Sequence, residues 1–411
     1  MEDRHAYFMK KALGMAFSRM GTTSPNPAVG AVIVKNGEII SLGGTCACGS
    51  DHAEVDAIKN AAAPLDGAEL YVTLEPCCHY GKTPPCTRAI IEAGILRVYI
   101  PILDPNPSVA GEGAACLRDA GVDVVMMTEM EHYASSLIRP FKKSILERAP
   151  FVIHKTALSL DGRIATSSGD SKWISSAHAR YFVHRLRAVV DAIIVGKNTL
   201  AADNPSLTVR LDSFSGDVKR YFAERDFDLR GHDNFFVHCL LKADEPACTV
   251  SPCRIVLGIP DDLEKKYAIF ADGNYIMFAD ESKKDACRTH PSYDRIKKLE
   301  SSGNIVFVKG ATVRERVDAT LGELNRRGMM CVLLEGGGVA AGTFLDAGQI
   351  DHFLYVISPR IIGRGVPPIM AAGAATVRES LALHDVSTVM INDDLLYSAY
   401  REPYGAAQGK G

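Results

Sequence analysis

The stretch LEPCCHYGKTPPC, residues 74–86, places three cysteines between a segment of strand character and a segment of helical character. Cysteines this close together pair as disulfides, lie in a core or bind a metal. The whole chain has 11 cysteines, an odd number, and its first residues lack the uninterrupted apolar core of a secretory signal. We therefore expect a cytoplasmic protein whose thiols are free, with a possible metal site at this stretch.

Segments with strand and helix patterns alternate on both sides of this stretch. AVGAVIVKNGEIISLG (28–43) predicts a hairpin around an Asn-Gly pair, and HAEVDAIKNAA (52–62) has helical spacing. AELYVTLEP (68–76) predicts a buried strand, and PPCTRAIIEAGI (84–95) predicts a helix that begins after its prolines. This alternation predicts an α/β protein with helices packed on a parallel or mixed sheet.

The length of the chain predicts two domains, because 411 residues exceed one average core. A polar helical segment at 135–150 marks the boundary, so we expect domains at 1–147 and 148–404. Residues 212–250 are rich in charged and aromatic side chains and show no clear period, which predicts an irregular insertion in the second domain. Residues 405–411 predict a disordered tail.

The composition argues against nucleic acid and membranes as partners. The net charge is −3, and no basic stripe stands out along the chain. Apolar residues make up 47% of the chain, but no apolar run reaches the roughly 18 residues that a membrane span needs. We expect a protein that binds neither nucleic acid nor membranes.

One histidine, two cysteines and a glutamate form a candidate zinc site. His52, Cys77 and Cys86 offer one imidazole and two thiolates, which suit Zn²⁺ and leave the fourth tetrahedral position for water. Zinc lowers the pKa of such a water and makes a hydroxide nucleophile. Glu54 can take the proton of that water and pass it to a departing amine. Nucleobase deaminases use this logic, with the signature H-x-E…P-C-x-x-C.

The spacing of the cysteines departs from that signature and leaves alternatives. The second thiol lies nine positions after Cys77, so the spacing is C-x₈-C. Cys46 and Cys48 could supply thiolates in its place, and a purely structural zinc site is a further alternative. The inserted residues include His79 and Lys82, whose side chains suit a phosphate or the polar edge of a ring.

These motifs resemble the deaminase half of the bifunctional deaminase/reductase family of riboflavin biosynthesis. The resemblance is carried by His-Ala-Glu at 52–54, SPNPAVG (24–30), PCCHYGKTPPC (76–86) and DPNP (104–107). The family usually has serine at the position of Cys78, which marks this thiol as a non-ligand. The resemblance implies that His52, Cys77 and Cys86 hold zinc and that Glu54 carries the proton. The resemblance also implies a substrate pocket lined by Asn26, His79, Lys82, Asp104 and Asn106.

The second domain has a glycine-rich turn, LEGGG (334–338), between a buried strand pattern and a helix pattern. Backbone N–H groups at such a turn can approach a phosphate, which suits a dinucleotide cofactor. The turn lacks the G-x-G-x-x-G pattern of an ordinary dinucleotide-binding fingerprint. Taken alone, it could equally be a tight structural turn.

Further motifs in this domain resemble the reductase half of the same family, which is dihydrofolate-reductase-like. They are TALSLDGRIA (156–165), SKWIS (171–175), GKNT (196–199) and LTVR (207–210). The resemblance implies NADPH as hydride donor. It implies cofactor contacts from Ala157, Trp173, Thr199, Asp203, Gly337, Gly338, Val339, Ala340, Ala341, Gly342 and Thr343. It implies substrate contacts from Ser171, Arg187, Leu207, Arg210 and Glu335, with the two arginines as partners of a ribose phosphate.

The expected fold is therefore α/β, with an N-terminal cytidine-deaminase-like three-layer domain and a C-terminal dihydrofolate-reductase-like domain. We predict a bifunctional enzyme that deaminates 2,5-diamino-6-ribosylamino-4(3H)-pyrimidinone 5′-phosphate and then reduces the ribosyl side chain to ribityl with NADPH. Small phosphorylated pyrimidines are the expected partners, and we expect a homo-oligomer. The alternatives are a nucleic-acid or free-nucleobase deaminase with a fused accessory domain, and a sensor that keeps the pockets without turnover.

Overall fold

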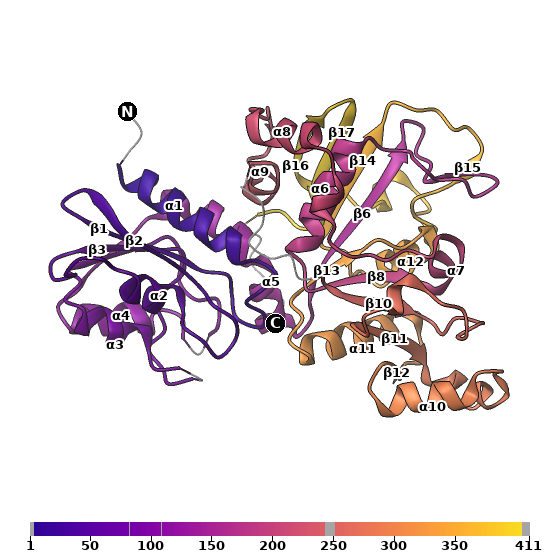
Figure 1. Ribbon diagram of the computed structural model, residues 1–411, viewed down its shortest axis with the longest axis horizontal. Coiled ribbons are helices and arrows are strands. Elements are labelled where there is room, and N and C mark those ends of the chain that lie inside the picture. The colour runs from indigo at the N-terminus through magenta and orange to yellow at the C-terminus, as the bar shows by residue number, and fades with distance from the viewer. Residues whose placement is uncertain (1–3, 82, 108, 243–250, 405–411) are drawn as a thin grey trace. The chain divides into compact units, whose positions relative to one another are not determined.

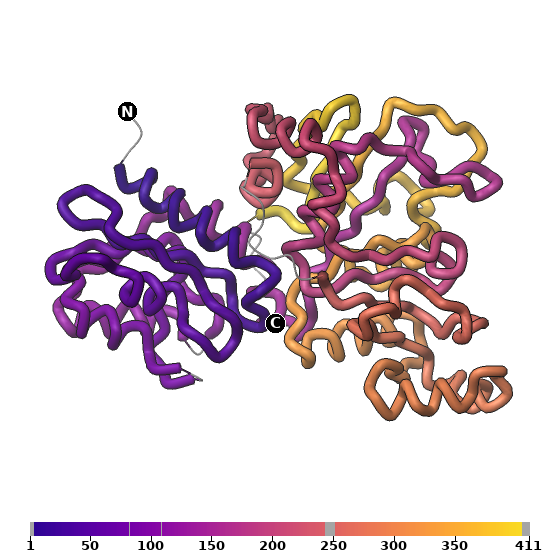
Figure 2. Tube along the Cα trace, viewed as in Figure 1, coloured from indigo at the N-terminus to yellow at the C-terminus, as the bar shows by residue number. Residues whose placement is uncertain are grey.

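A computed structural model describes residues 4–81, 83–107, 109–242 and 251–404 (Figure 1). The chain divides into two compact units, the first formed by Met1–Arg148 with Phe235–Thr249, and the second by Ala149–Asn234 with Val250–Gly411. The domain boundary predicted between residues 147 and 148 lies one residue from this division. Figure 2 follows residues 4–148 in indigo and purple and the later part of the chain from magenta to yellow.

The first unit is built on a five-stranded mixed sheet with strand order β2-β1-β3-β4-β5. The strand β1 pairs antiparallel with β2 and β3, whereas β3, β4 and β5 run parallel. The strands are β1 (Gly30–Lys35), β2 (Glu38–Gly44), β3 (Glu69–Val72), β4 (Arg97–Ile100) and β5 (Asp123–Met126). The predicted hairpin joins β1 and β2, and its turn residues Asn36 and Gly37 both have positive φ, as a tight two-residue turn requires.

Helices cover both faces of this sheet and make three layers (Figure 1). They are α1 (Arg4–Arg19), α2 (Ala53–Lys59), α3 (Cys86–Glu92), α4 (Glu112–Asp119) and α5 (Glu131–Glu147). The neighbouring glycines Gly43 and Gly44 of β2 point to opposite faces, where a β-carbon would meet the backbone of α2 and the Arg19 side chain of α1 respectively. Glycine at Gly43 therefore lets α2 lie close to the sheet, with His52 immediately before its first residue.

The second unit contains a ten-stranded sheet of order β12-β11-β10-β8-β13-β6-β14-β17-β16-β9. Strands from β12 to β14 run parallel, and β14, β17, β16 and β9 pair antiparallel. The strands are β6 (Phe151–Ser159), β8 (Ala192–Gly196), β9 (Arg230–Gly231), β10 (Cys253–Leu257), β11 (Tyr275–Asp280), β12 (Ile305–Val308), β13 (Cys331–Leu334), β14 (His352–Ser358), β16 (His384–Ile391) and β17 (Asp394–Tyr400). A separate pair is formed by β7 (Ala165–Thr166) and β15 (Gly365–Val366).

Helices bury the apolar faces of the central strands in the second unit. They are α6 (Ala177–Ala188), α7 (Lys197–Asp203), α8 (Gly216–Glu224), α10 (Tyr293–Ser301), α11 (Val313–Arg326) and α12 (Gly338–Asp346). The core contains Val152 of β6, Ile194 of β8 and Leu334 of β13, packed with Leu321 of α11 and Phe344 of α12. Because these parallel strands are covered on both faces, their sequences are continuous apolar runs rather than alternating patterns.

The segment 212–242 is not irregular, so this part of the prediction is wrong. It contains α8, the short strand β9 and the helix α9 (Phe235–Lys242). The helix α9 moreover belongs to the first unit, where Phe236 lies 6.3 Å from Phe17, measured between ring centroids. These helices have only 9 and 8 residues, too few for a clear period in the sequence. The rest of the predicted insertion, 243–250, and the predicted tail, 405–411, lie outside the described residues.

Within the part of the chain that the structure describes, no helix is both long and apolar enough to span a bilayer.

Candidate active sites

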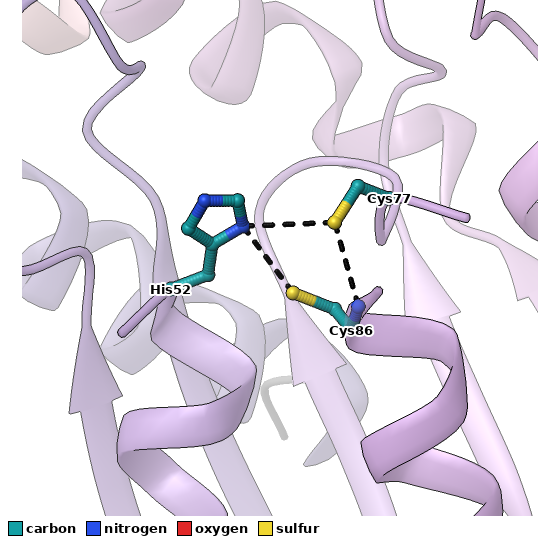
Figure 3. A group of neighbouring side chains, drawn as sticks. All are labelled: His52, Cys77 and Cys86. Carbon is teal, nitrogen blue, oxygen red and sulfur yellow. Dashed lines mark hydrogen bonds between the residues drawn. The ribbon is translucent and has the colours of Figure 1, made fainter. Parts of the chain in front are cut away.

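The three expected zinc ligands meet in the first unit, from elements that are separate in the sequence (Figure 3). His52 immediately precedes α2, Cys77 lies in the loop after β3, and Cys86 is the first residue of α3. Nδ1 of His52 lies 3.7 Å from Sγ of Cys77 and 3.3 Å from Sγ of Cys86. Zinc bonds of about 2.3 Å to sulfur and about 2.0 Å to nitrogen place two tetrahedral ligands about 3.6 Å apart. Both distances from Nδ1 of His52 are therefore close to those between ligands of one zinc ion.

Other cysteines near this site are not part of the ligand cluster. All ligand atoms of the three residues lie within 4.8 Å of one another, and no further group of this kind occurs among the described residues. Cys46 donates a hydrogen bond to the carbonyl oxygen of Gly44, and Cys48 lines the adjoining pocket. Cys78 lies next to a ligand in sequence but stays outside the cluster. The geometry thus gathers one histidine and two cysteines, which would hold a metal ion together.

Hydrogen bonds between the ligand side chains change their pKa values. A side-chain hydrogen bond from Cys86, and a second bond with His52, lower the pKa of Cys77, whereas the hydrogen bond with Cys77 and burial raise the pKa of Cys86. The backbone N–H of Cys86 also donates to Sγ of Cys77, over 3.4 Å. The hydrogen bond with Cys77 raises the pKa of His52. A thiolate at Cys77 is the form that binds a metal.

Glu54 lies in the first turn of α2, two residues after His52, and its side chain is buried. Burial and the nearby charge of Cys77 raise the pKa of Glu54 to about 7. A carboxyl group with a pKa near the working pH can both accept and donate a proton. Glu54 lines the same pocket as His52 and Cys77, so it can reach a reacting group there.

A pocket of about 390 Å³ adjoins the ligand cluster in the first unit. Four of the five side chains expected to bind the substrate line it, namely Asn26, His79, Asp104 and Asn106. Phe141 and Ile145 of α5 give it an apolar wall. The fifth, Lys82, lies outside the described residues.

Glu75 also lines this pocket and did not emerge from the sequence analysis. Its carboxylate is buried and accepts hydrogen bonds from the backbone N–H groups of Asp104, Gly111 and Ala114, at 3.0, 2.9 and 2.9 Å. Charge-assisted bonds of this kind hold the loop that carries Asp104 and Asn106 against the pocket. A carboxylate at the end of an apolar strand, just before a proline, was the signal that could have revealed it.

The second unit has a cleft of about 1090 Å³ at the carboxyl ends of the parallel strands β6, β8 and β13. Ligands of open α/β sheets bind at this edge because the strand-to-helix loops converge there. Thirteen of the residues expected to bind the cofactor or the substrate line the cleft: Ala157, Ser171, Trp173, Arg187, Thr199, Asp203, Arg210, Glu335, Gly337, Gly338, Val339, Ala340 and Thr343.

Three expected contact residues are not among the cleft-lining residues that the structure describes. Leu207 and Ala341 are buried, and Gly342 packs against the backbone of Met370. The helical period of α12 explains why Ala341 and Gly342 do not line the cleft. Val339, Ala340 and Thr343 share the face of the helix toward the cleft, and the two residues between them face the interior. The expectation that 337–343 contact the cofactor throughout stays a prediction, and the described cleft wall contains Gly337, Gly338, Val339, Ala340 and Thr343 of this range.

The glycine turn after β13 is held close to its neighbours. The N–H of Gly337 donates to Oγ1 of Thr199 over 3.2 Å, which ties the turn to α7. A β-carbon at Gly338 would collide with the carbonyl oxygen of Pro367, so only glycine fits there. The nine-residue helix α12 begins at this glycine. The turn thus offers a phosphate both close backbone approach and a helix N-terminus.

A buried ion pair forms the floor of the cleft. The guanidinium of Arg187 donates two bonds to Glu335, at 2.7 Å from Nε and 2.9 Å from Nη2, and each side chain is 11% exposed. Burial opposes ionisation, but Arg187 and Lys155 lower the pKa of Glu335 to about 2. Burial also lowers the pKa of Lys155, which lines the cleft beside this pair.

The pairing changes the expectation for the two arginines. Nε and Nη2 of Arg187 donate to Glu335, so this edge of the guanidinium is engaged and only the edge formed by Nη1 and Nη2 can face another anion. Arg210 is exposed, and its Nη1 donates to Oγ of Ser206 over 2.8 Å. Arg210 therefore has a guanidinium that is open to solvent, whereas that of Arg187 is held by Glu335.

Comparison with known proteins relates both sites to one family. The cytidine and deoxycytidylate deaminase zinc-binding region matches residues 2–102, and the RibD C-terminal domain matches residues 150–397. Riboflavin biosynthesis protein RibD of Bacillus amyloliquefaciens is 36% identical over 373 residues, which cover 89% of this chain and 88% of the relative. The chain belongs to the RibD family.

Other RibD proteins match over nearly the whole chain. RibD of Aquifex aeolicus is 35% identical over 390 residues, covering 95% of this chain and 96% of the relative. A solved structure from Thermotoga maritima superposes with a TM-score of 0.75 at 31% identity, covering 97% of this chain and 98% of that one. RibD of Acinetobacter baumannii gives a TM-score of 0.74 at 28% identity with the same coverage.

The RibD relationship confirms the predicted fold, a cytidine-deaminase-like domain followed by a dihydrofolate-reductase-like domain. It also confirms the predicted class of activity. The chain is a bifunctional deaminase and reductase of riboflavin biosynthesis, and its cofactors are Zn²⁺ and NADPH. The alternative of a nucleic-acid or free-nucleobase deaminase with an accessory domain is not favoured.

Proposed function

We propose that the first unit deaminates 2,5-diamino-6-ribosylamino-4(3H)-pyrimidinone 5′-phosphate and that the second unit then reduces the ribosyl side chain to ribityl. The relative from Thermotoga maritima is named a diaminohydroxyphosphoribosylaminopyrimidine deaminase/5-amino-6-(5-phosphoribosylamino)uracil reductase. The observation that carries the proposal is the cluster of His52, Cys77 and Cys86 beside the buried carboxyl of Glu54. In the same chain, a second cleft offers a glycine turn and an ionised Glu335.

In the deamination, water adds to the ring carbon that bears the amine, and ammonia leaves. The three ligands would hold zinc, which supplies Lewis-acid chemistry that lowers the pKa of a water molecule. Glu54 takes a proton from the attacking water and delivers it to the departing amine, and its pKa of about 7 suits both transfers. Because Glu54 is fixed in the first turn of α2 beside His52, its carboxyl stays within the pocket throughout.

Recognition of the pyrimidine falls to side chains around the same pocket. Asn26, Asp104 and Asn106 offer amide and carboxylate groups to the polar edge of the ring, and His79 lies at the exposed rim, where a phosphate remains near solvent. The backbone N–H of Asn106 donates to Oδ1 of Asp104 over 2.8 Å, which restricts the rotation of that carboxylate. Glu75 acts through this loop and is a positioning residue.

In the reduction, a hydride and a proton convert the ribosyl group into the open ribityl chain. NADPH supplies the hydride when bound, and the residues of the cleft position the reacting carbon against it. The glycine turn at 336–338 suits the pyrophosphate of the cofactor, and Arg210 suits the 5′-phosphate of the substrate. Arg187 keeps the carboxylate of Glu335 ionised and fixed in orientation.

A coupled assay on the purified full chain tests the proposal. Metal analysis, ammonia release and NADPH oxidation are followed with the phosphorylated diaminopyrimidine as substrate. We expect one zinc per chain, one ammonia released per substrate and one NADPH oxidised per ammonia. Ammonia release without NADPH oxidation would contradict the assigned reduction, and deamination of single-stranded nucleic acid in preference to the pyrimidine would contradict the assigned substrate.

Three expectations about the setting of the enzyme remain predictions. We propose that it acts on small molecules without binding nucleic acid, that it forms a homo-oligomer and that it resides in the cytoplasm. The net charge of −3 supports the first of these. Filter binding with single-stranded RNA, light scattering of the purified chain and cell fractionation measure the three properties.

A further inference from the structure

The histidine His184 lines the reductase cleft and has no part in the function proposed above. It lies on α6, one turn before Arg187, and its side chain is 7% exposed. Its ring packs edge-on against Phe214, with 5.3 Å between ring centroids. The residue is therefore fixed in the wall of the cleft by the helix on one side and by an aromatic ring on the other.

The imidazole of His184 connects α6 to the segment that carries Arg210. The backbone N–H of Arg210 donates to Nδ1 of His184 over 3.0 Å. This segment has no strand or helix of its own between Asn204 and Arg210, and Leu207 within it has a φ of 52°, the left-handed region that a leucine rarely adopts. A backbone held in such a conformation needs tertiary bonds to keep it there.

Charged groups around the ring keep it neutral. Burial, Arg187 and Arg210 lower the pKa of His184 to about 3, while Glu335 opposes them and Lys155 adds to them. A neutral imidazole whose Nδ1 accepts a hydrogen bond carries its proton on Nε2. At neutral pH the imidazole is therefore uncharged and can accept the bond from Arg210, which a charged imidazole could not do.

We propose that His184 is a positioning residue of the reductase, which fixes the backbone at Arg210 so that the guanidinium stays aligned with the 5′-phosphate of the substrate. The inference rests on the proposed reduction, and it adds a residue that selects phosphorylated over unphosphorylated substrate. Arg187 differs from Arg210 because its Nε and Nη2 hold Glu335, which fixes its guanidinium without any help from His184. One exposed arginine on a loop gives little selectivity unless its backbone is held.

The test uses substitutions that distinguish the roles of the two ring nitrogens of His184. His184→Asn keeps an acceptor near the position of Nδ1, whereas His184→Gln offers its amide near the position of Nε2, and His184→Leu removes both. We expect His184→Leu and His184→Gln to lower kcat/KM for the phosphorylated substrate about tenfold, the effect of one lost buried hydrogen bond. His184→Asn should stay within about twofold of the unchanged enzyme.

Measurements with the unphosphorylated form of the same substrate distinguish a loss of phosphate positioning from general damage to the enzyme. We expect kcat/KM for that form, and the dissociation constant of NADPH, to be the same in all three variants. His178→Leu on the same helix α6 is the matched control, because His178 contacts Tyr221 and is not among the cleft-lining residues that the structure describes. Equal losses for both forms of the substrate, or an asparagine variant as impaired as the leucine variant, would overturn the proposal.

A double-mutant cycle and a binding probe complete the test. Arg210→Ala should abolish the preference for phosphate, and adding His184→Leu to it should cause no further loss, since both act on one contact. Full additivity of the two effects would overturn the proposal. Binding of ribose 5-phosphate, measured by calorimetry, should weaken about tenfold in His184→Leu. If the unchanged chain binds this probe but oxidises no NADPH, the assigned reduction fails while the role of His184 at the phosphate site stands.

Discussion

Glu54 and Glu335 are both buried glutamates in active sites, yet their environments change their pKa values in opposite directions. Burial and the charge of Cys77 raise the pKa of Glu54 to about 7, whereas Arg187 and Lys155 lower that of Glu335 to about 2 against the effect of burial. The first carboxyl is suited to moving a proton, and the second is suited to staying charged. The neighbouring charges, rather than the residue type, therefore decide what a buried carboxyl can do.

The largest effect is expected at the carboxyl that moves a proton. Glu54→Gln should lower the rate of ammonia release by about 10³-fold, the scale of general acid–base catalysis. Zinc content should be unchanged, because Glu54 is outside the ligand cluster. The measurement is ammonia release with metal analysis of the same sample. NADPH oxidation with the deaminated intermediate is the control and should not change, and retained deamination would contradict the role of Glu54.

The second largest effect is expected when Arg187, whose charge keeps Glu335 ionised, is replaced. Arg187→Leu leaves a buried carboxylate without its bidentate partner, which should lower the free energy of unfolding of the second unit by about 3 kcal/mol. Urea unfolding measures the loss. In the double variant Arg187→Leu with Glu335→Leu, most of the stability should return, because neither member of the ion pair is left without the other. A double variant no more stable than the single one would show that the ion pair does not control stability here.

The third prediction concerns the stability of the fold at low pH. Glu335 has a lowered pKa in the folded chain, so it stabilises the fold above its ordinary pKa of 4.5. This contribution, about 3 kcal/mol, should be lost as the pH falls from 4.5 to about 2. Unfolding of Glu335→Gln, measured at several pH values, should show a correspondingly flatter dependence in that range. An unchanged slope in this variant would mean that other groups dominate acid unfolding.

The smallest effect is expected at Cys78, which a matched change at Cys77 distinguishes from a zinc ligand. Cys78→Ser should leave zinc content and deamination nearly unchanged, because this thiol is not in the cluster of ligands. Cys77→Ser is the matched change one residue earlier, and we expect it to lose zinc because a hydroxyl replaces a thiolate ligand. Metal analysis of both variants checks the pair. Loss of zinc in Cys78→Ser would overturn the choice of ligands.

The two sites also differ in how far the sequence alone revealed them. The zinc set could be predicted from residue type and order, because few combinations of His, Glu, Pro and Cys serve one chemistry. The reductase cleft has no such set, since its chemistry is carried by the cofactor. Its residues were inferred from family resemblance, and three of them, Leu207, Ala341 and Gly342, are not in the cleft wall of the described structure.

Some functional contacts could not have been predicted at all from the sequence. The ion pair of Arg187 with Glu335 joins residues 148 positions apart, and the bond of Arg210 to His184 crosses from a loop to a helix. The helix α9 packs in the first unit although it is surrounded in sequence by the second. Each depends on how distant elements pack, which local propensity does not encode.

The sequence by itself determined the α/β fold class, the two-domain organisation and the chemistry of the first site, because apolar periodicity and the types of metal ligand are local properties of a chain. Only the tertiary structure decided that Arg187 pairs with Glu335, that Glu75 holds the loop of Asp104 and that His184 holds Arg210. The physical reason is that a charge or a hydrogen-bonding group acquires its function from the partners that folding brings to it.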